Sequence, residues 1–257
     1  MPAALDSSSP DWNNCYDRIS PTPVLVVSVE TPLSDSNVSL NTVFEKLLEY
    51  YGPQAWWPAE SPLEIMIGAV LTQNTSWKNV EKAIANLKDA DLLHLGRLNG
   101  TRQEELAEII RPSGYYRLKA KRLANLIDHV VTRYDGDLEW MFSHDVTSLR
   151  EELLGINGIG PETADSILLY AGNLKTFVVD TYTARILKRH GWIEWEADYH
   201  QIQDHFVSQV PSETEHYNEF HALIVRAGNQ FCRKTPKCEG CPLACYLPES
   251  GIQEPEY

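Results

Sequence analysis

Long apolar runs and positive charge are both scarce in this chain of 257 residues. No apolar run approaches the roughly 20 residues that a membrane-spanning helix needs, and the first residues are polar and acidic rather than signal-like. We therefore expect a soluble intracellular protein with no membrane partner. The 22 Lys and Arg residues are outnumbered by 36 Asp and Glu, for a net charge of −14, which argues against a nucleic-acid partner.

The distribution of the charge weakens that objection. Residues 115–133 are basic, with only Asp128 opposing their Arg and Lys residues, and Arg185, Lys188 and Arg189 follow later in the chain. The acidic residues concentrate at the N-terminus, in 194–215 and in the last ten residues. A basic face on an acidic protein can still bind nucleic acid, although the binding should be sensitive to salt.

Strand-like alternation is also scarce, because no period-2 pattern lasts long enough for a sheet. From Asn41 onward, apolar residues recur instead at helical spacing. One helical run ends at Gly52, and the run over 61–74 begins with Ser61 as N-cap and Pro62 at the first helical position. We predict an all-α protein with about ten helices, preceded by a disordered extension over residues 1–40.

Cysteine is rare except near the C-terminus. Four of the five cysteines are Cys232, Cys238, Cys241 and Cys245, and Cys15 stands alone without an assigned role. Clustering of this kind in an intracellular protein indicates metal or cluster ligands rather than disulfides.

The most informative stretch is residues 153–183. Gly155, Gly158 and Gly160 lie in a tight turn between two apolar runs, and Asp180 follows between β-branched residues and another helical run. Glycine permits positive φ and close approach of another backbone. Amides in such a turn, at a helix N-terminus, can point at a phosphate.

This arrangement resembles the helix-hairpin-helix and aspartate signature of the endonuclease III superfamily of DNA glycosylases, over roughly residues 41–245. The resemblance implies a six-helix lobe over 65–170 that ends in the hairpin, and a second lobe formed by 41–64 and 171–257. It also implies that the three hairpin glycines bind the DNA backbone. A cleft between the lobes would hold Asp180 and an aromatic pocket.

In such an enzyme, Asp180 stabilises the positive charge that develops at C1′ as the glycosidic bond breaks, and it can orient the attacking water. Asp180 could instead be only the N-cap of the following helix, and the two roles are compatible. Bifunctional relatives carry a lysine two residues after the G-[IV]-G element, but this chain has Glu162 there. A carboxylate cannot form an imine, so the resemblance implies a glycosylase without efficient strand cleavage.

The segment 55–87 contains WWP and LTQNT elements, which look most like the 3-methyladenine DNA glycosylase III branch. Asn74, with Gln73 beside it, would fill the gap that a flipped base leaves in the duplex. Trp56, Trp57 and Trp77 are candidates for a pocket that stacks on a cationic alkylated purine, and the alternative for each is ordinary core packing.

Two further elements fit the superfamily. GYYRLKAKRL at 114–123 resembles its turn and basic helix, in which Lys119 could contact a phosphate or merely be solvated. The cysteine spacing C-x5-C-x2-C-x3-C is shorter than the usual C-x6-C-x2-C-x5-C of the [4Fe–4S] loop. The resemblance implies an iron–sulfur cluster with a structural role, and a tetrahedral Zn²⁺ site is the alternative.

Together these features predict a base-excision repair enzyme that releases a damaged base, an alkylated purine, from double-stranded DNA. We expect a monomer that is cytoplasmic or nucleoid-associated. Two alternatives stay open: a bifunctional lyase acting on oxidised pyrimidines, and a relative that binds DNA without catalysis.

Overall fold

The computed structural model describes residues 38–54 and 56–254, and this part of the chain is all-α. The predicted fold class is thus confirmed, whereas Cys15 and nearly all of the predicted 1–40 extension lie outside the described residues. The helices are α1 (Leu40–Tyr51), α2 (Pro62–Leu71), α3 (Trp77–Asp89), α4 (Leu95–Gly100), α5 (Gln103–Ile109), α6 (Tyr116–Tyr134), α7 (Leu138–Phe142), α8 (Val146–Leu154), α9 (Pro161–Ser166), α10 (Thr181–Arg189), α11 (Tyr199–Gln209) and α12 (Thr214–Gln230).

The end of α1 and the start of α2 fall where the sequence predicts, whereas α2 ends at Leu71 rather than at 74. Helix α1 stops at Gly52, which has φ +69°, a value that glycine adopts without strain. Ser61 caps α2 by accepting a hydrogen bond from the Glu64 amide at 3.2 Å, and Pro62 occupies the first turn.

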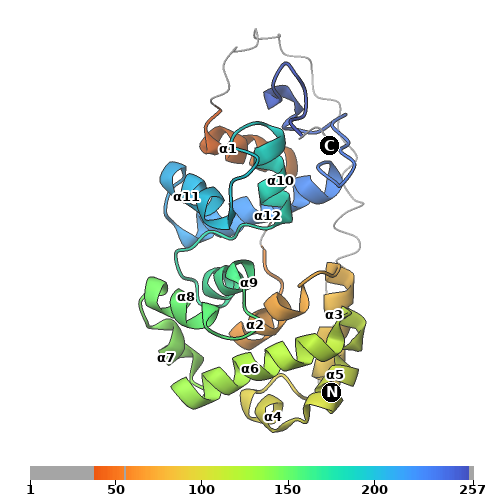
Figure 1. The fold of residues 1–257 in the computed structure, drawn as a ribbon, viewed down its shortest axis with the longest axis vertical. Helices are drawn as coiled ribbons and strands as arrows, with labels where there is room; N and C mark the ends of the chain where they lie inside the picture. Colours follow the sequence, from red (N-terminus) through yellow and green to blue (C-terminus); the bar gives the residue numbers. More distant parts are fainter. Residues whose placement is uncertain (1–37, 55, 255–257) are drawn as a thin grey trace, which may run out of the picture. The chain divides into compact units, whose positions relative to one another are not determined.

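The buried apolar residues form two clusters. One joins residues between Leu63 and Leu168, from α2 to the start of the π-helical turn that follows α9. The other joins residues of α1 to residues between Leu169 and Leu243, which include α10, α11 and α12. Figure 1 shows these two groups of helices. The region expected as a six-helix lobe over 65–170 contains the eight helices α2 to α9, because the loops between the longer helices contain short ones such as α4 and α7.

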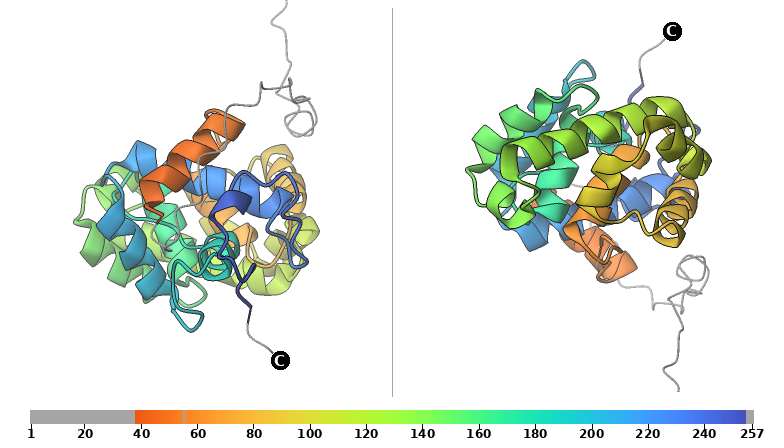
Figure 2. Two further views of the ribbon diagram at one scale, coloured as in Figure 1. Left: turned by 90° about the horizontal axis from the view of Figure 1, so that it is seen from above. Right: turned by 90° about the horizontal axis from the view of Figure 1, so that it is seen from below.

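Helix α6, with 19 residues, is the longest helix of the described part of the chain. It packs against α2, α4, α5 and α7 and organises the first cluster (Figure 2). None of the described helices is both long and apolar enough to span a bilayer.

Two segments run from one cluster to the other. Residues 52–61 connect α1 to α2, and the Gln54 amide donates to Glu219 Oε1 at 2.6 Å while Arg226 donates to Gln54 Oε1 at 2.8 Å. Residues 172–180 connect the end of the hairpin to α10. The first segment is therefore anchored at Gln54, and the second one ends at Asp180.

Candidate active site

The hairpin between α8 and α9 requires glycine at one position above all. Gly158 has φ +101°, and a Cβ there would lie 2.2 Å from Arg122 Cγ. Gly155 and Gly160 have negative φ values of −70° and −96°, so neither depends on glycine for its backbone conformation. A Cβ on Gly160 would meet nothing within 4 Å, so the hairpin is open to solvent just before α9.

Gln73, in the turn that follows α2, holds this hairpin. Its side-chain amide donates to the Gly158 carbonyl at 3.2 Å and to Thr163 Oγ1 at 2.9 Å, and its oxygen accepts from Arg122. Gln73 is thus committed to internal bonds, whereas the neighbouring Asn74 is exposed and has φ 53°. Of the two predicted amides, Asn74 is the one presented to solvent.

Asp180 caps α10. Its Oδ1 accepts from the Thr183 amide at 2.7 Å and from Thr183 Oγ1 at 2.8 Å. Its Oδ2 lies 3.8 Å from His221 Nε2, and the side chain is 13 % exposed. The predicted N-cap is therefore present, and it leaves one carboxylate oxygen without a capping partner.

A buried tyrosine and histidine lie beside Asp180. Tyr170 belongs to a π-helical turn, Ile167–Ala171, that follows α9. Such turns are rare overall, and those that occur are often found at functional sites. Its hydroxyl is hydrogen-bonded to His221 Nδ1. Burial raises the pKa of Tyr170 well above its ordinary value and lowers the pKa of His221.

The three predicted pocket tryptophans do come together. The centroid of the Trp57 ring lies 5.0 Å from that of Trp77 and 6.1 Å from that of Trp56. The Trp56 and Trp77 centroids are 6.0 Å apart. Trp57 also lies 5.0 Å from the Tyr170 ring. The aromatic cluster is thus connected to the Asp180 carboxylate through Tyr170 and His221.

Glu162, at the position of the absent lysine, lies in the first turn of α9. Its side chain is accessible to solvent but is surrounded by protein at an open groove that Gln73, Arg122 and Tyr199 also line. Burial raises the pKa of Glu162 to about 7, and the Asp180 charge adds to the shift. Glu162 therefore changes charge near neutral pH.

The prediction that Lys119 contacts DNA is wrong. Lys119 is 1 % exposed, and its ammonium donates to the Leu71 carbonyl at 2.8 Å and to the Ser113 carbonyl at 2.6 Å. Burial lowers its pKa to about 8. The ammonium joins the end of α2 to the turn before α6, where Tyr115 is 71 % exposed with φ 45°.

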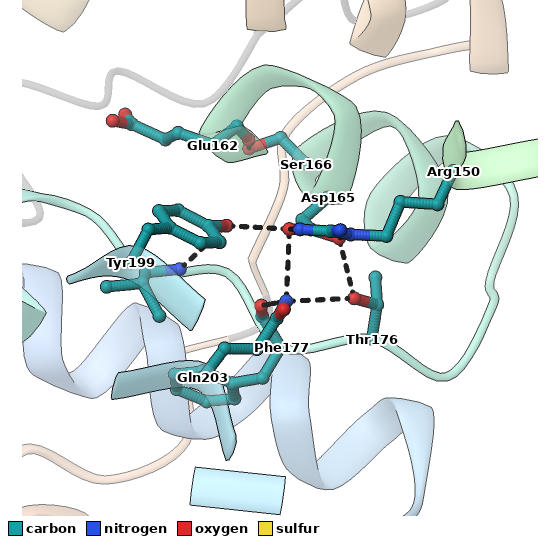
Figure 3. A network of polar contacts seen from close by, with 9 residues as sticks. Arg150, Glu162, Asp165, Ser166, Thr176, Phe177, Tyr199 and Gln203 are labelled. Carbon is teal, nitrogen blue, oxygen red and sulfur yellow. Dashed lines mark hydrogen bonds and ion pairs between the residues drawn. The ribbon is translucent and has the colours of Figure 1, made fainter. Parts of the chain in front are cut away.

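Sequence reasoning missed a network around Asp165, which is fully buried in α9 (Figure 3). Arg150 pairs with both of its oxygens, at 2.8 and 2.9 Å. Thr176, Tyr199 and Gln203 also donate to Asp165, at 2.7, 2.8 and 3.0 Å.

The same network fixes the segment that leads to Asp180. Gln203 donates to the Phe177 carbonyl at 2.6 Å, and the Val179 amide donates to the Tyr199 hydroxyl at 3.3 Å. The only signal in the sequence was an acidic residue within an apolar helical run. Glu162 extends away from this network (Figure 3).

Three of the four clustered cysteines, Cys232, Cys238 and Cys241, line one apolar cavity together with Arg189. The Arg189 guanidinium donates to Cys232 Sγ at 3.4 Å and to the Arg233 carbonyl at 2.6 Å. Cys245 is exposed and does not line this cavity. Among the described residues, no three His, Cys, Asp or Glu side chains are placed closely enough to bind a metal ion. Four thiols suit a soft metal, but Cys245 lies apart from the other three.

Comparison with known proteins agrees with this geometry. The family model described as "HhH-GPD superfamily base excision DNA repair protein" matches residues 67–212. A protein of Methanocaldococcus jannaschii named "Putative DNA repair glycosylase" is 50% identical over 203 residues, which cover 78% of this chain and 92% of the relative. Endonuclease III of Thermotoga maritima is 28% identical over 181 residues, covering 70% of this chain and 79% of the relative.

Solved structures agree as well. The Helicobacter pylori 3-methyladenine DNA glycosylase bound to 1,N6-ethenoadenine is 34% identical, with a TM-score of 0.65, and the match covers 74% of this chain and 96% of that one. An endonuclease III in a non-covalent DNA complex shares the fold, with a TM-score of 0.71 at 23% identity over 82% of this chain and 94% of that one. The chain belongs to the HhH-GPD superfamily of base-excision repair DNA glycosylases, the endonuclease III superfamily that its sequence resembles.

Proposed function

We propose that this protein hydrolyses the N-glycosidic bond of a damaged base in duplex DNA and leaves the strand uncut. The observation that carries the proposal is the Asp180 carboxylate, which is held at the start of α10 by one oxygen only. The other oxygen is available to the positive charge that develops on the sugar as the bond breaks. The same carboxylate can orient the water that attacks C1′.

In this proposal, the hairpin and its neighbouring residues bind the DNA. The turn over Gly155, Gly158 and Gly160 would bind the strand backbone, because it is open before α9 and Gln73 and Arg122 fix it from behind. Asn74 would fill the gap that the flipped base leaves, because it is exposed while Gln73 is engaged.

An alkylated purine is the proposed substrate. Trp56, Trp57 and Trp77 provide electron-rich faces, and such faces attract a cationic base. The 34% identical relative from Helicobacter pylori is a 3-methyladenine DNA glycosylase, which supports this substrate class over an oxidised pyrimidine.

A panel of duplexes with single lesions tests the proposal. Each duplex carries one alkylated, deaminated or oxidised base, and free base release is measured under single-turnover conditions. We expect release from alkylated purines, with strand breaks only after alkali or an abasic endonuclease is added. Base release from oxidised pyrimidines alone would contradict the substrate assignment, and binding without release from any duplex would contradict the enzymatic one.

Borohydride trapping gives a sharper prediction about strand cleavage. Because Glu162 has no amine to form an imine, wild-type protein should give no trapped covalent complex above a protein-free control. Glu162→Lys restores an amine on the accessible first turn of α9 and should give a trapped complex. Glu162→Gln, which changes the same side chain without adding an amine that could form an imine, is the matched control. Trapping by wild-type protein would show a bifunctional enzyme instead.

Glu162 should also make DNA binding depend on pH. With a pKa of about 7, this carboxyl is mostly neutral at pH 6 and mostly charged at pH 8, beside the groove where the strand would bind. We expect the affinity for an abasic-analogue duplex to fall about two- to fivefold over this range in wild-type protein, because a like charge disfavours the phosphates. Glu162→Gln should show a clearly flatter profile in fluorescence anisotropy at constant salt. An equal slope in both proteins would contradict the assignment.

The cysteines would hold a [4Fe–4S] cluster. Arg189 already orders the loop around Cys232, and cluster binding would require Cys245 to join the other three. When bound, the cluster would serve as a structural tie for the C-terminal segment. Purified protein should contain iron and acid-labile sulfide and absorb visible light, and Cys238→Ser should lose all three. Colourless protein with one bound zinc would favour the tetrahedral alternative.

A further inference from the structure

The Asp180 carboxylate has one satisfied oxygen and one that faces a histidine. Oδ1 receives two hydrogen bonds from Thr183, whereas Oδ2 lies 3.8 Å from His221 Nε2. That separation is longer than a hydrogen bond. Catalytic hydrogen bonds are often long without substrate and tighten in the complex.

The histidine nitrogen has no other partner. His221 is 6 % exposed, and its Nε2 is buried without a hydrogen bond to any described residue. Unpaired buried polar atoms are uncommon and call for an explanation. The titratable groups that contact this imidazole are Asp180, from the start of α10, and Tyr170, from the π-helical turn. The Phe177 ring, from the connecting segment, lies perpendicular to the imidazole with the two ring centroids 6.4 Å apart.

The two imidazole nitrogens face different partners, Tyr170 at Nδ1 and Asp180 at Nε2. A neutral imidazole has one N–H donor and one acceptor nitrogen. Burial lowers the pKa of His221 and raises that of Tyr170, so the imidazole is neutral and the phenol keeps its proton. Because a carboxylate can only accept, the tautomer that bonds Asp180 carries its proton on Nε2, and Nδ1 then accepts from the phenol.

We propose that His221 is a positioning residue for Asp180 and that Tyr170 stabilises the tautomer that His221 needs. The inference rests on the proposed function, in which Asp180 acts at the sugar. The Nε2–H group holds Oδ2 in place as Thr183 holds Oδ1, so the plane of the carboxylate is fixed from both sides. A second lone pair on Oδ2 stays free to face the developing charge. Tyr170 also contacts Trp57, so the packing of the aromatic cluster bears on this pair.

Two substitutions of similar size distinguish hydrogen-bond donation to Asp180 from simple filling of the space that His221 occupies. His221→Gln keeps an N–H donor near the position of Nε2, and His221→Met fills the same space without one. We expect His221→Met to slow single-turnover base release about 10- to 100-fold, the effect of one charge-assisted hydrogen bond. His221→Gln should stay within about fivefold of wild type, and both variants should bind abasic-analogue DNA like wild type. Equal rates in the two variants would overturn the proposal, whether both are fast or both are slow.

Tyr170→Phe tests the tautomer role. A glutamine amide has no tautomer to select, so Tyr170→Phe should slow base release about three- to tenfold in wild-type protein but less than twofold in the His221→Gln protein. The same loss in both backgrounds would overturn this part. The proposed function is checked separately, because wild-type activity and its loss in Asp180→Asn do not depend on His221. If those two results hold while the His221 variants show no difference, only the inference about His221 fails.

Discussion

Asp180→Asn is expected to slow single-turnover base release at least about a hundredfold while the protein folds and binds abasic-analogue DNA normally. Asparagine caps helices as well as aspartate does, so its oxygen can still accept the Thr183 amide bond that fixes α10. What the substitution removes is the negative charge that stabilises the cationic transition state, and removal of a single preorganised group of this kind costs about 10²- to 10³-fold or more.

Asp198→Asn is a matched control for this substitution. Asp198 caps α11, accepts from the Gln201 amide at 2.9 Å and belongs to a capping box. The same chemical change there should leave base release within about twofold of wild type, because a cap retains its bond in both residues. Base release by Asp180→Asn within tenfold of wild type, with the control unchanged, would refute the catalytic role of Asp180.

Asp165→Ala is expected to cost about 3–5 kcal/mol in the free energy of unfolding, measured by urea denaturation. The substitution leaves the Arg150 guanidinium without its partner and removes an acceptor from Tyr199 and Gln203. Removing one partner of a buried, hydrogen-bonded ion pair is among the most destabilising single changes. Because Gln203 and Tyr199 also bind the segment before Asp180, base release by the folded fraction should fall as well.

Asp137→Ala provides the comparison. Asp137 caps α7 on the exposed surface and accepts from the Trp140 amide at 2.9 Å. Loss of an exposed cap should cost only about 1 kcal/mol and should not slow base release. If the two alanine variants were equally stable, the Asp165 network would have no special part in holding the Asp180 segment.

The helix ends, the hairpin glycine and the family of this protein could be predicted from its sequence, because they depend on local chemistry. Gly52 ends α1 and Ser61 with Pro62 begins α2, because caps and positive φ depend on the residue itself and its near neighbours. Gly158 was marked by the hairpin pattern, and its φ of +101° accounts for it. The motif order from the tryptophans through the hairpin to Asp180 was sufficient to identify the family, which the comparisons confirm.

The partners of the side chains were decided by the tertiary structure. Lys119 reads as a surface residue in a basic helix, yet packing puts its ammonium on the Leu71 carbonyl, 48 residues away. His221 and Tyr170 are 51 residues apart and gave no signal at all. Residue type and helical spacing determine which face of a helix is apolar. Which buried donor meets which acceptor depends on how the helices pack, and that is set by the whole chain.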